Sequence, residues 1–194
     1  AQFAVDRYLA PVYWSAVVMV AIFGTIVADA IHVGLRIPYL VSSLGFGVAL
    51  VLIFIVWYRT EGTLSIHHID TRRRELFYWA TVMATFALGT AAGDLAATTF
   101  GLGFFGSGVM FTGFIVLPAL GYRFLGLDSI AAFWIAYVLT RPLGASFADW
   151  LGRAKTLSGV GLGTGLVGLV LTVIIVALVG YLSVTRRDVD TVHE

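Results

Sequence analysis

The segment YWATVMATFALGTAAGD, which spans residues 78–94, decides the fold of this chain because its pattern occurs three times. In each copy the first residue of an aromatic pair precedes a glycine by eleven residues, and that glycine precedes an aspartate by five. The other copies are YWSAVVMVAIFGTIVAD at 13–29 and FWIAYVLTRPLGASFAD at 133–149. Self-similarity at a fixed spacing is typical of a repeated structural unit, so we predict three copies of one unit.

The composition around these copies is that of a membrane protein. Hydrophobic residues make up 59% of the 194 positions and charged residues 12%, whereas a soluble domain carries about 25% charged residues. A bilayer core needs about 20 apolar helical residues. Six segments meet that test: 12–32, 38–58, 76–98, 104–122, 130–150 and 160–183. We therefore predict an all-α polytopic membrane helix bundle.

The six spans divide into three two-helix repeats within a single membrane domain over 1–194. The predicted units cover 12–58, 76–122 and 132–183. Because each unit contributes two spans, every copy enters the membrane from the same side and the repeats are parallel. The second helix of each unit is predicted to begin with small residues that allow close packing. These residues are Ser42, Ser43, Gly45 and Gly47; Gly103, Gly106, Ser107 and Gly108; and Gly159, Gly161, Gly163 and Gly165.

Basic residues in the connections predict the orientation. One set of connections holds Arg7, Arg59, Arg72, Arg73, Arg74, Arg123, Arg186 and Arg187, and the other holds Arg36, Arg153 and Lys155. Since arginine and lysine gather on the cytoplasmic side, we place both termini in the cytoplasm. The polar loop between the first two units contains His67, His68 and Asp70, which we interpret as a solvated loop beside a topology anchor and not as a metal site.

The three repeated aspartates, Asp29, Asp94 and Asp149, are the main candidate functional residues. Each lies about 24 Å along its helix from the aromatic pair, so all three are expected at one depth near the extracytoplasmic end of the bundle. An ionised aspartate at a helix centre costs about 2.5–3.5 kcal/mol, which calls for an explanation. We predict that the three carboxylates line a path for a cation or proton.

Hydroxyl side chains near the aspartates extend that candidate site. Thr25 and Thr90 follow the repeated glycines, and Ser146 lies close to Asp149. Carboxylates and hydroxyls are hard oxygen ligands, suited to a proton, an alkali ion or a divalent ion such as Mg²⁺ or Mn²⁺. Any metal ligands would therefore be the three aspartates.

Two alternatives to a cation path stay open at this point. The aspartates lie within about a turn of a helix end and could cap the next helix or reach headgroup water. Arg141, within the fifth span, could pair with an aspartate and lock the bundle, or bind an anionic substrate. Arg153, Lys155 and His32 are read as residues of the membrane interface.

Other classes of function are excluded or unsupported. The net charge of +1 and the scattered arginines exclude a nucleic-acid partner. The absence of cysteine excludes thiolate chemistry. No metalloprotease helix, nucleophile elbow, phosphate loop or dinucleotide fingerprint occurs, so we predict neither an enzyme nor a cofactor.

The chain resembles a family of bacterial membrane proteins built from a tandem repeat of unknown function, often described as uncharacterised membrane-anchored proteins. The matching stretches are "EGTLSIHHIDTRRRE", the segment from Tyr78 through "ATFALGTAAGDLAA", and Gly101-Leu102-Gly103. The resemblance implies a bacterial inner-membrane location and four copies of the unit, the first of which would be missing here. The third copy departs from the pattern at Ala145 and at Arg141-Pro142.

The resulting functional prediction is a small secondary transporter or channel for a cation, with the lipid bilayer as its surroundings. The rival prediction is a non-transporting accessory or scaffold subunit that packs against a larger membrane complex. Since three two-helix repeats are few for enclosing a pore, a homo-oligomer is one expected arrangement.

Overall fold

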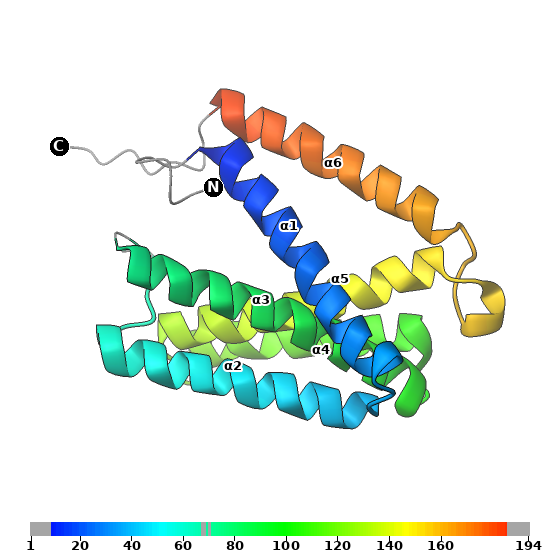
Figure 1. Ribbon diagram of the computed structural model, residues 1–194, viewed down its shortest axis with the longest axis horizontal. Coiled ribbons are helices and arrows are strands. Elements are labelled where there is room, and N and C mark those ends of the chain that lie inside the picture. Colours follow the sequence, from blue (N-terminus) through cyan, green and yellow to red (C-terminus); the bar gives the residue numbers. More distant parts are fainter. Residues whose placement is uncertain (1–8, 67–68, 70, 186–194) are drawn as a thin grey trace.

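The computed structural model describes residues 9–66, 69 and 71–185, which form six long helices joined by short connections (Figure 1). The helices are α1 (Ala10–Asp29), α2 (Tyr39–Glu61), α3 (Arg72–Asp94), α4 (Gly103–Phe124), α5 (Ser129–Gly152) and α6 (Thr164–Thr185). Three short turns of other helix types complete the order: π-helical η2 (Ala30–Gly34) and η3 (Leu95–Thr99), and 3-10 helical η4 (Lys155–Leu157). The predicted all-α bundle is confirmed.

All six helices are long and apolar enough to cross a bilayer. The chain is therefore a multi-pass integral membrane protein, as predicted. Large hydrophobic side chains are exposed along the helices, including Ile22 on α1, Leu52 on α2 and Leu169 on α6. Such side chains are compatible with the hydrocarbon core of a bilayer. The helices satisfy their backbone hydrogen bonds internally, as that environment requires.

Local signals set the helix boundaries. The Asp128 side chain caps α5 by accepting hydrogen bonds from the backbone N–H groups of Ile130 and Ala131 at 3.0 and 3.1 Å. The last span was predicted to begin at residue 160, but α6 begins at Thr164. Gly161 and Gly163 adopt φ values of 89° and 88°, which lie outside any right-handed helix, and they form the connection instead.

Helix α3 is the centre of the bundle and packs against α1, α2 and α5 (Figure 1). Helix α4 packs against α5, and α6 contacts α5 and α1. Half of the most apolar stretch of α3 is buried inside the structure, compared with 6% for α6. The middle repeat therefore supplies the protein core, while α6 is left largely for the lipid.

The α1–α3 and α3–α5 crossings use the same position of the repeat. A Cβ atom added at Gly24 would lie 2.7 Å from the Phe86 Cβ atom, and one added at Gly89 would overlap the Arg141 Cβ atom. Phe86 and Arg141 occupy equivalent positions in the second and third copies. The glycines of the first two copies thus let the first helix of the next copy approach closely.

Aromatic side chains pack at the end of the bundle opposite the aspartates. Trp57, Tyr78, Val82 and Trp134 form a buried cluster there. Nearby, Arg73 and Arg74 form ion pairs with Glu61 at 2.5 and 2.8 Å. This contact ties the connection between α2 and α3 to the end of α2.

Candidate site at the repeated aspartates

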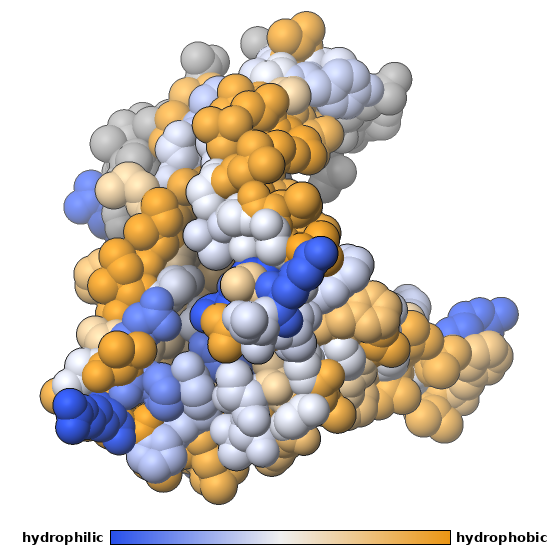
Figure 2. Space-filling model, turned by 90° about the vertical axis from the view of Figure 1, so that its right-hand side faces the viewer, coloured by the Kyte–Doolittle hydropathy of each residue, from blue (hydrophilic) through white to orange (hydrophobic). Residues whose placement is uncertain are grey.

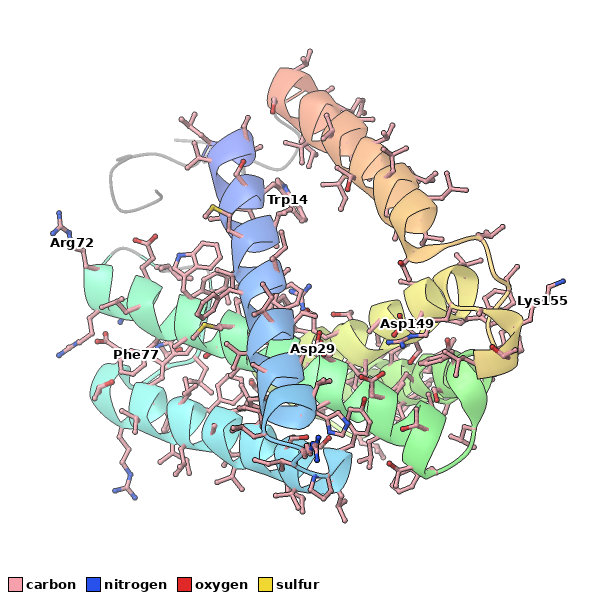
Figure 3. The ribbon with its side chains drawn as sticks, turned by 45° about the vertical axis from the view of Figure 1, so that its right-hand side comes forward. Trp14, Asp29, Arg72, Phe77, Asp149 and Lys155 are labelled. Atoms are coloured by element: carbon pink, nitrogen blue, oxygen red, sulfur yellow. The ribbon has the colours of Figure 1, made fainter. Side chains whose placement is uncertain are left out.

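The three repeated aspartates come together at one end of the bundle. Asp29 ends α1, Asp94 ends α3 and Asp149 lies in the last turns of α5. Asp29 and Asp149 lie in the same part of the structure, far from Arg72 at the opposite end (Figure 3). The charges of all three carboxylates act on one another electrostatically. Seen from this end, hydrophilic residues gather around a hollow in a surface that is otherwise mainly hydrophobic (Figure 2).

The three carboxylates differ in how far they are buried. Asp94, in the central repeat, is 8% exposed. The Asp149 side chain is 29% exposed, and Asp29 is exposed. Helix α3 packs against both α1 and α5, the equivalent helices of the other two copies, and this central position agrees with the deeper burial of its aspartate.

A tyrosine hydroxyl from a neighbouring element lies beside the Asp94 carboxylate. The Tyr39 hydroxyl, at the start of α2, is placed for a side-chain hydrogen bond with the Asp94 carboxylate. The Tyr39 ring stacks on His32, whose Nδ1 lies 2.6 Å from the Ile37 carbonyl oxygen. Within the part of the chain that the structure describes, Asp94 has no ion pair at contact distance.

Asp149, by contrast, is paired with a cation. Its Oδ1 lies 3.1 Å from the Arg153 Nε, and the Arg153 Nη2 donates a hydrogen bond to Oδ2 at 3.5 Å. The guanidinium also stands over the Phe104 ring, 5.0 Å from its centroid. Val33 and Thr98 hold the equivalent position in the other copies, so the ion pair is specific to the third copy.

The Arg153 side chain remains positively charged in this setting. Burial lowers its pKa, but the hydrogen bond and the charge of Asp149 raise it, and so do the charges of Asp94 and Tyr39. The net result is a pKa above the usual arginine value. Sequence reasoning had placed Arg153 at the interface. Its spacing of four residues from Asp149 on one helix was the signal that could have predicted the pair.

The candidate hydroxyl residues Thr25 and Thr90 lie one helical turn before the aspartates of their copies. The Thr25 and Thr90 Oγ1 atoms are 3.4 Å apart across the α1–α3 crossing. Ala145 takes the equivalent position in α5, and the next residue, Ser146, is 1% exposed. Its Oγ faces Gly93, directly before Asp94, and finds no hydrogen-bond partner among the described residues.

Arg141 does not join the aspartates. It donates a hydrogen bond to the Tyr137 hydroxyl at 2.5 Å, and its guanidinium lies 3.9 Å from the centroid of the Phe86 ring. No described carboxylate forms an ion pair with it, and its buried Nε has no hydrogen-bond partner in that part of the chain. The charge neutralisation considered for Arg141 is thus provided by Arg153.

A row of tyrosine hydroxyls continues from Arg141 toward the opposite end. The Tyr137 hydroxyl is within hydrogen-bonding reach of Tyr78, and the Tyr78 and Tyr13 hydroxyls are 2.5 Å apart. Tyr13 and Tyr78 begin the aromatic pairs of their copies, where the third copy has Phe133. Tyr137, one turn later, supplies the hydroxyl that Phe133 lacks.

No group of three or more histidine, aspartate or glutamate side chains among the described residues is placed to hold a metal ion. The predicted metal ligands Asp29, Asp94 and Asp149 therefore do not form a shared coordination site here. His67, His68 and Asp70 lie outside the described residues.

Comparison with known proteins identifies the repeat. A family model described as a Repeat of Unknown Function, DUF347, matches residues 12–63, 77–126 and 132–188. The match covers all three copies and most of the chain. No curated protein and no solved structure matches.

Proposed function

Because the chain belongs to the DUF347 family of repeats of unknown function, we propose its function from the geometry: a small secondary transporter or channel for a cation. The observation that supports this proposal is the buried Asp94 carboxylate, which feels the charges of two further carboxylates and forms no ion pair with any residue that the structure describes. A proton, an alkali ion or a divalent metal ion is the candidate substrate, and no enzymatic reaction is proposed.

The charges at this end of the bundle favour a cation. Among the described residues, the positive charges that act on Asp29 and Asp94 come from the Arg153 guanidinium and, more weakly, from His32. With the carboxylates ionised, the cluster has an excess of negative charge in a region of low dielectric constant, where such charge is costly. A cation that binds beside Asp94 would relieve this cost.

Polar groups extend from the aspartates toward the aromatic end of the bundle, and they suggest the course of the path. Thr25 and Thr90 lie one turn from the carboxylates. The tyrosine row then leads from Arg141 toward the aromatic end. Ionisable residues inside a membrane bundle commonly mark ion pathways and proton relays, and here hydroxyl groups extend from such residues. We propose that the cation passes along these helices, and that Arg141 controls passage between the two halves.

The distribution of arginine residues between the two ends of the bundle supports an orientation of the protein in the membrane. If each of the six candidate spans crosses the bilayer once, α1 begins and α6 ends on the same side of the membrane. The basic connections lie at that side, so we propose that it is the cytoplasmic side of a bacterial inner membrane and that the aspartate cluster lies near the outer surface.

Ion flux into proteoliposomes tests the proposal. Protons, sodium, potassium, magnesium and manganese are screened with the wild-type protein and with Asp94→Asn. Asp128→Asn is the matched control, because it changes an aspartate at the opposite end of α5 and asparagine caps helices equally well. We expect Asp94→Asn to lose flux and Asp128→Asn to retain it. Thermal melting should show that both variants are folded. If the wild type conducts no ion, the proposal fails and an accessory or scaffold role becomes the better account.

A further inference from the structure

Arg153 is a cation built into the aspartate cluster by the protein itself. It contacts Asp149 at 3.1 Å, and its charge also acts on Asp29 and Asp94. The Phe104 ring of α4 holds the guanidinium from the other side. Neither of the other copies has a basic residue at this position, so the third copy carries a counter-charge that the repeat itself does not require.

A second observation is a buried hydroxyl group beside the cluster that a further ligand could contact. Ser146 is 1% exposed, and its Oγ has no hydrogen-bond partner among the described residues. It lies against Gly93, so it faces the backbone beside Asp94. A buried hydroxyl without a partner costs about 1–3 kcal/mol, which an ion or a water molecule at that point would recover.

We propose that Arg153 makes this site selective for monovalent cations, with Asp94 and the Ser146 hydroxyl as ligands. This inference rests on the proposed function and names its substrate class. At a given distance a fixed positive charge repels a divalent ion twice as strongly as a monovalent one. Asp149, already paired with Arg153, is lost as a ligand for a metal ion.

The ligand count leads to the same conclusion. Ca²⁺ takes six to eight oxygen ligands and Mg²⁺ needs near-octahedral coordination, usually with one or two carboxylates. The described residues contain no group of three acidic or histidine side chains placed around one point. A proton needs only one acceptor, and an alkali ion carries a single charge that one carboxylate balances, so either fits the buried Asp94 carboxylate better than a divalent ion does.

Manganese binding to purified protein in nanodiscs tests this selectivity without depending on flux. Electron paramagnetic resonance measures the affinity for Mn²⁺ in the wild type, Arg153→Gln, Arg153→Lys and Arg36→Gln. Removal of the guanidinium charge should strengthen Mn²⁺ binding by about tenfold or more. Arg153→Lys keeps the charge and Arg36→Gln removes a charge from another connection at the same end, so both should bind Mn²⁺ as weakly as the wild type.

Flux measurements complete the test. In Arg153→Gln, Mn²⁺ should inhibit the monovalent flux at about a tenfold lower concentration than in the wild type. A folded Arg153→Gln protein with unchanged Mn²⁺ affinity overturns the proposal, as does tighter binding in Arg153→Lys. If the wild type shows no flux while Arg153→Gln binds Mn²⁺ more tightly, the transport function fails but the charge selectivity of the site is supported.

Discussion

The second and third repeats have the same helical architecture, but their aspartates differ in burial and in ion pairing. In the second repeat Asp94 is buried and has no ion pair among the described residues, while in the third Asp149 is half-buried and paired with Arg153. The third repeat also has Arg141 where the second has Phe86. Two arginines thus distinguish helices that otherwise follow one pattern. The comparison teaches that repetition positions the carboxylates and that single substitutions decide which carboxylate remains available to a ligand.

The largest expected effect comes from the repeated glycine. Gly89 lies against the Arg141 backbone, whereas Gly144, its equivalent in the third repeat, has nothing within 4 Å among the described residues. We expect Gly89→Ala to force α3 and α5 apart and to lower the free energy of unfolding by about 1–3 kcal/mol. Gly144→Ala should be neutral or slightly stabilising, because alanine favours helix. Unfolding in detergent micelles measures both, and equal effects would contradict the packing assigned to Gly89.

An intermediate effect is expected at Arg141, the other difference between the two repeats. Arg141→Met keeps an unbranched apolar side chain but removes the guanidinium, and with it the hydrogen bond to Tyr137 and the cation–π contact with Phe86. The loss should lower the free energy of unfolding by about 1–2 kcal/mol. Arg141→Lys should restore little, since an ammonium group cannot reproduce the planar stacking. Thermal melting of the two variants provides the comparison, and full stability of Arg141→Met would show that these contacts contribute nothing.

The smallest effect is expected in the tyrosine row. Tyr78→Phe removes a buried hydroxyl that contacts Tyr13, and should cost about 1 kcal/mol. Tyr122→Phe, on an exposed part of α4, is the matched control and should change stability by less than half as much. Chemical unfolding monitored by tryptophan fluorescence distinguishes the two. A larger loss in Tyr122→Phe would contradict the hydrogen-bonded row.

Most of the architecture could be predicted from the sequence because the repeat and the apolar spans follow simple rules. The spacing from aromatic pair to Asp29, Asp94 and Asp149 fixed their common depth, and the structure brings them to one end. The start of α6 was misplaced because glycines that favour close packing and glycines that form a turn look alike in a sequence.

Contacts between distant elements could not be predicted. The approach of Tyr39 to Asp94 depends on how α2 packs on η3, which no local pattern reports. An aspartate partner was one of the alternatives for Arg141 because both are intramembrane charges, but the Arg141 side chain extends back along α5 toward Tyr137. The π-helical turns after Asp29 and Asp94 likewise had no signal in the sequence.

A comparison of cation flux through Asp94→Asn and Asp149→Asn in the same proteoliposomes tests the central claim most directly. Because Asp94 is the buried carboxylate without an ion pair, Asp94→Asn should reduce flux to background. Asp149→Asn leaves Asp94 in place and removes the ion pair with Arg153, so flux should fall less than in Asp94→Asn. The free energy of unfolding should fall by about 1 kcal/mol, because the lost ion pair is partly exposed. Flux at the wild-type level in a folded Asp94→Asn protein would contradict the account.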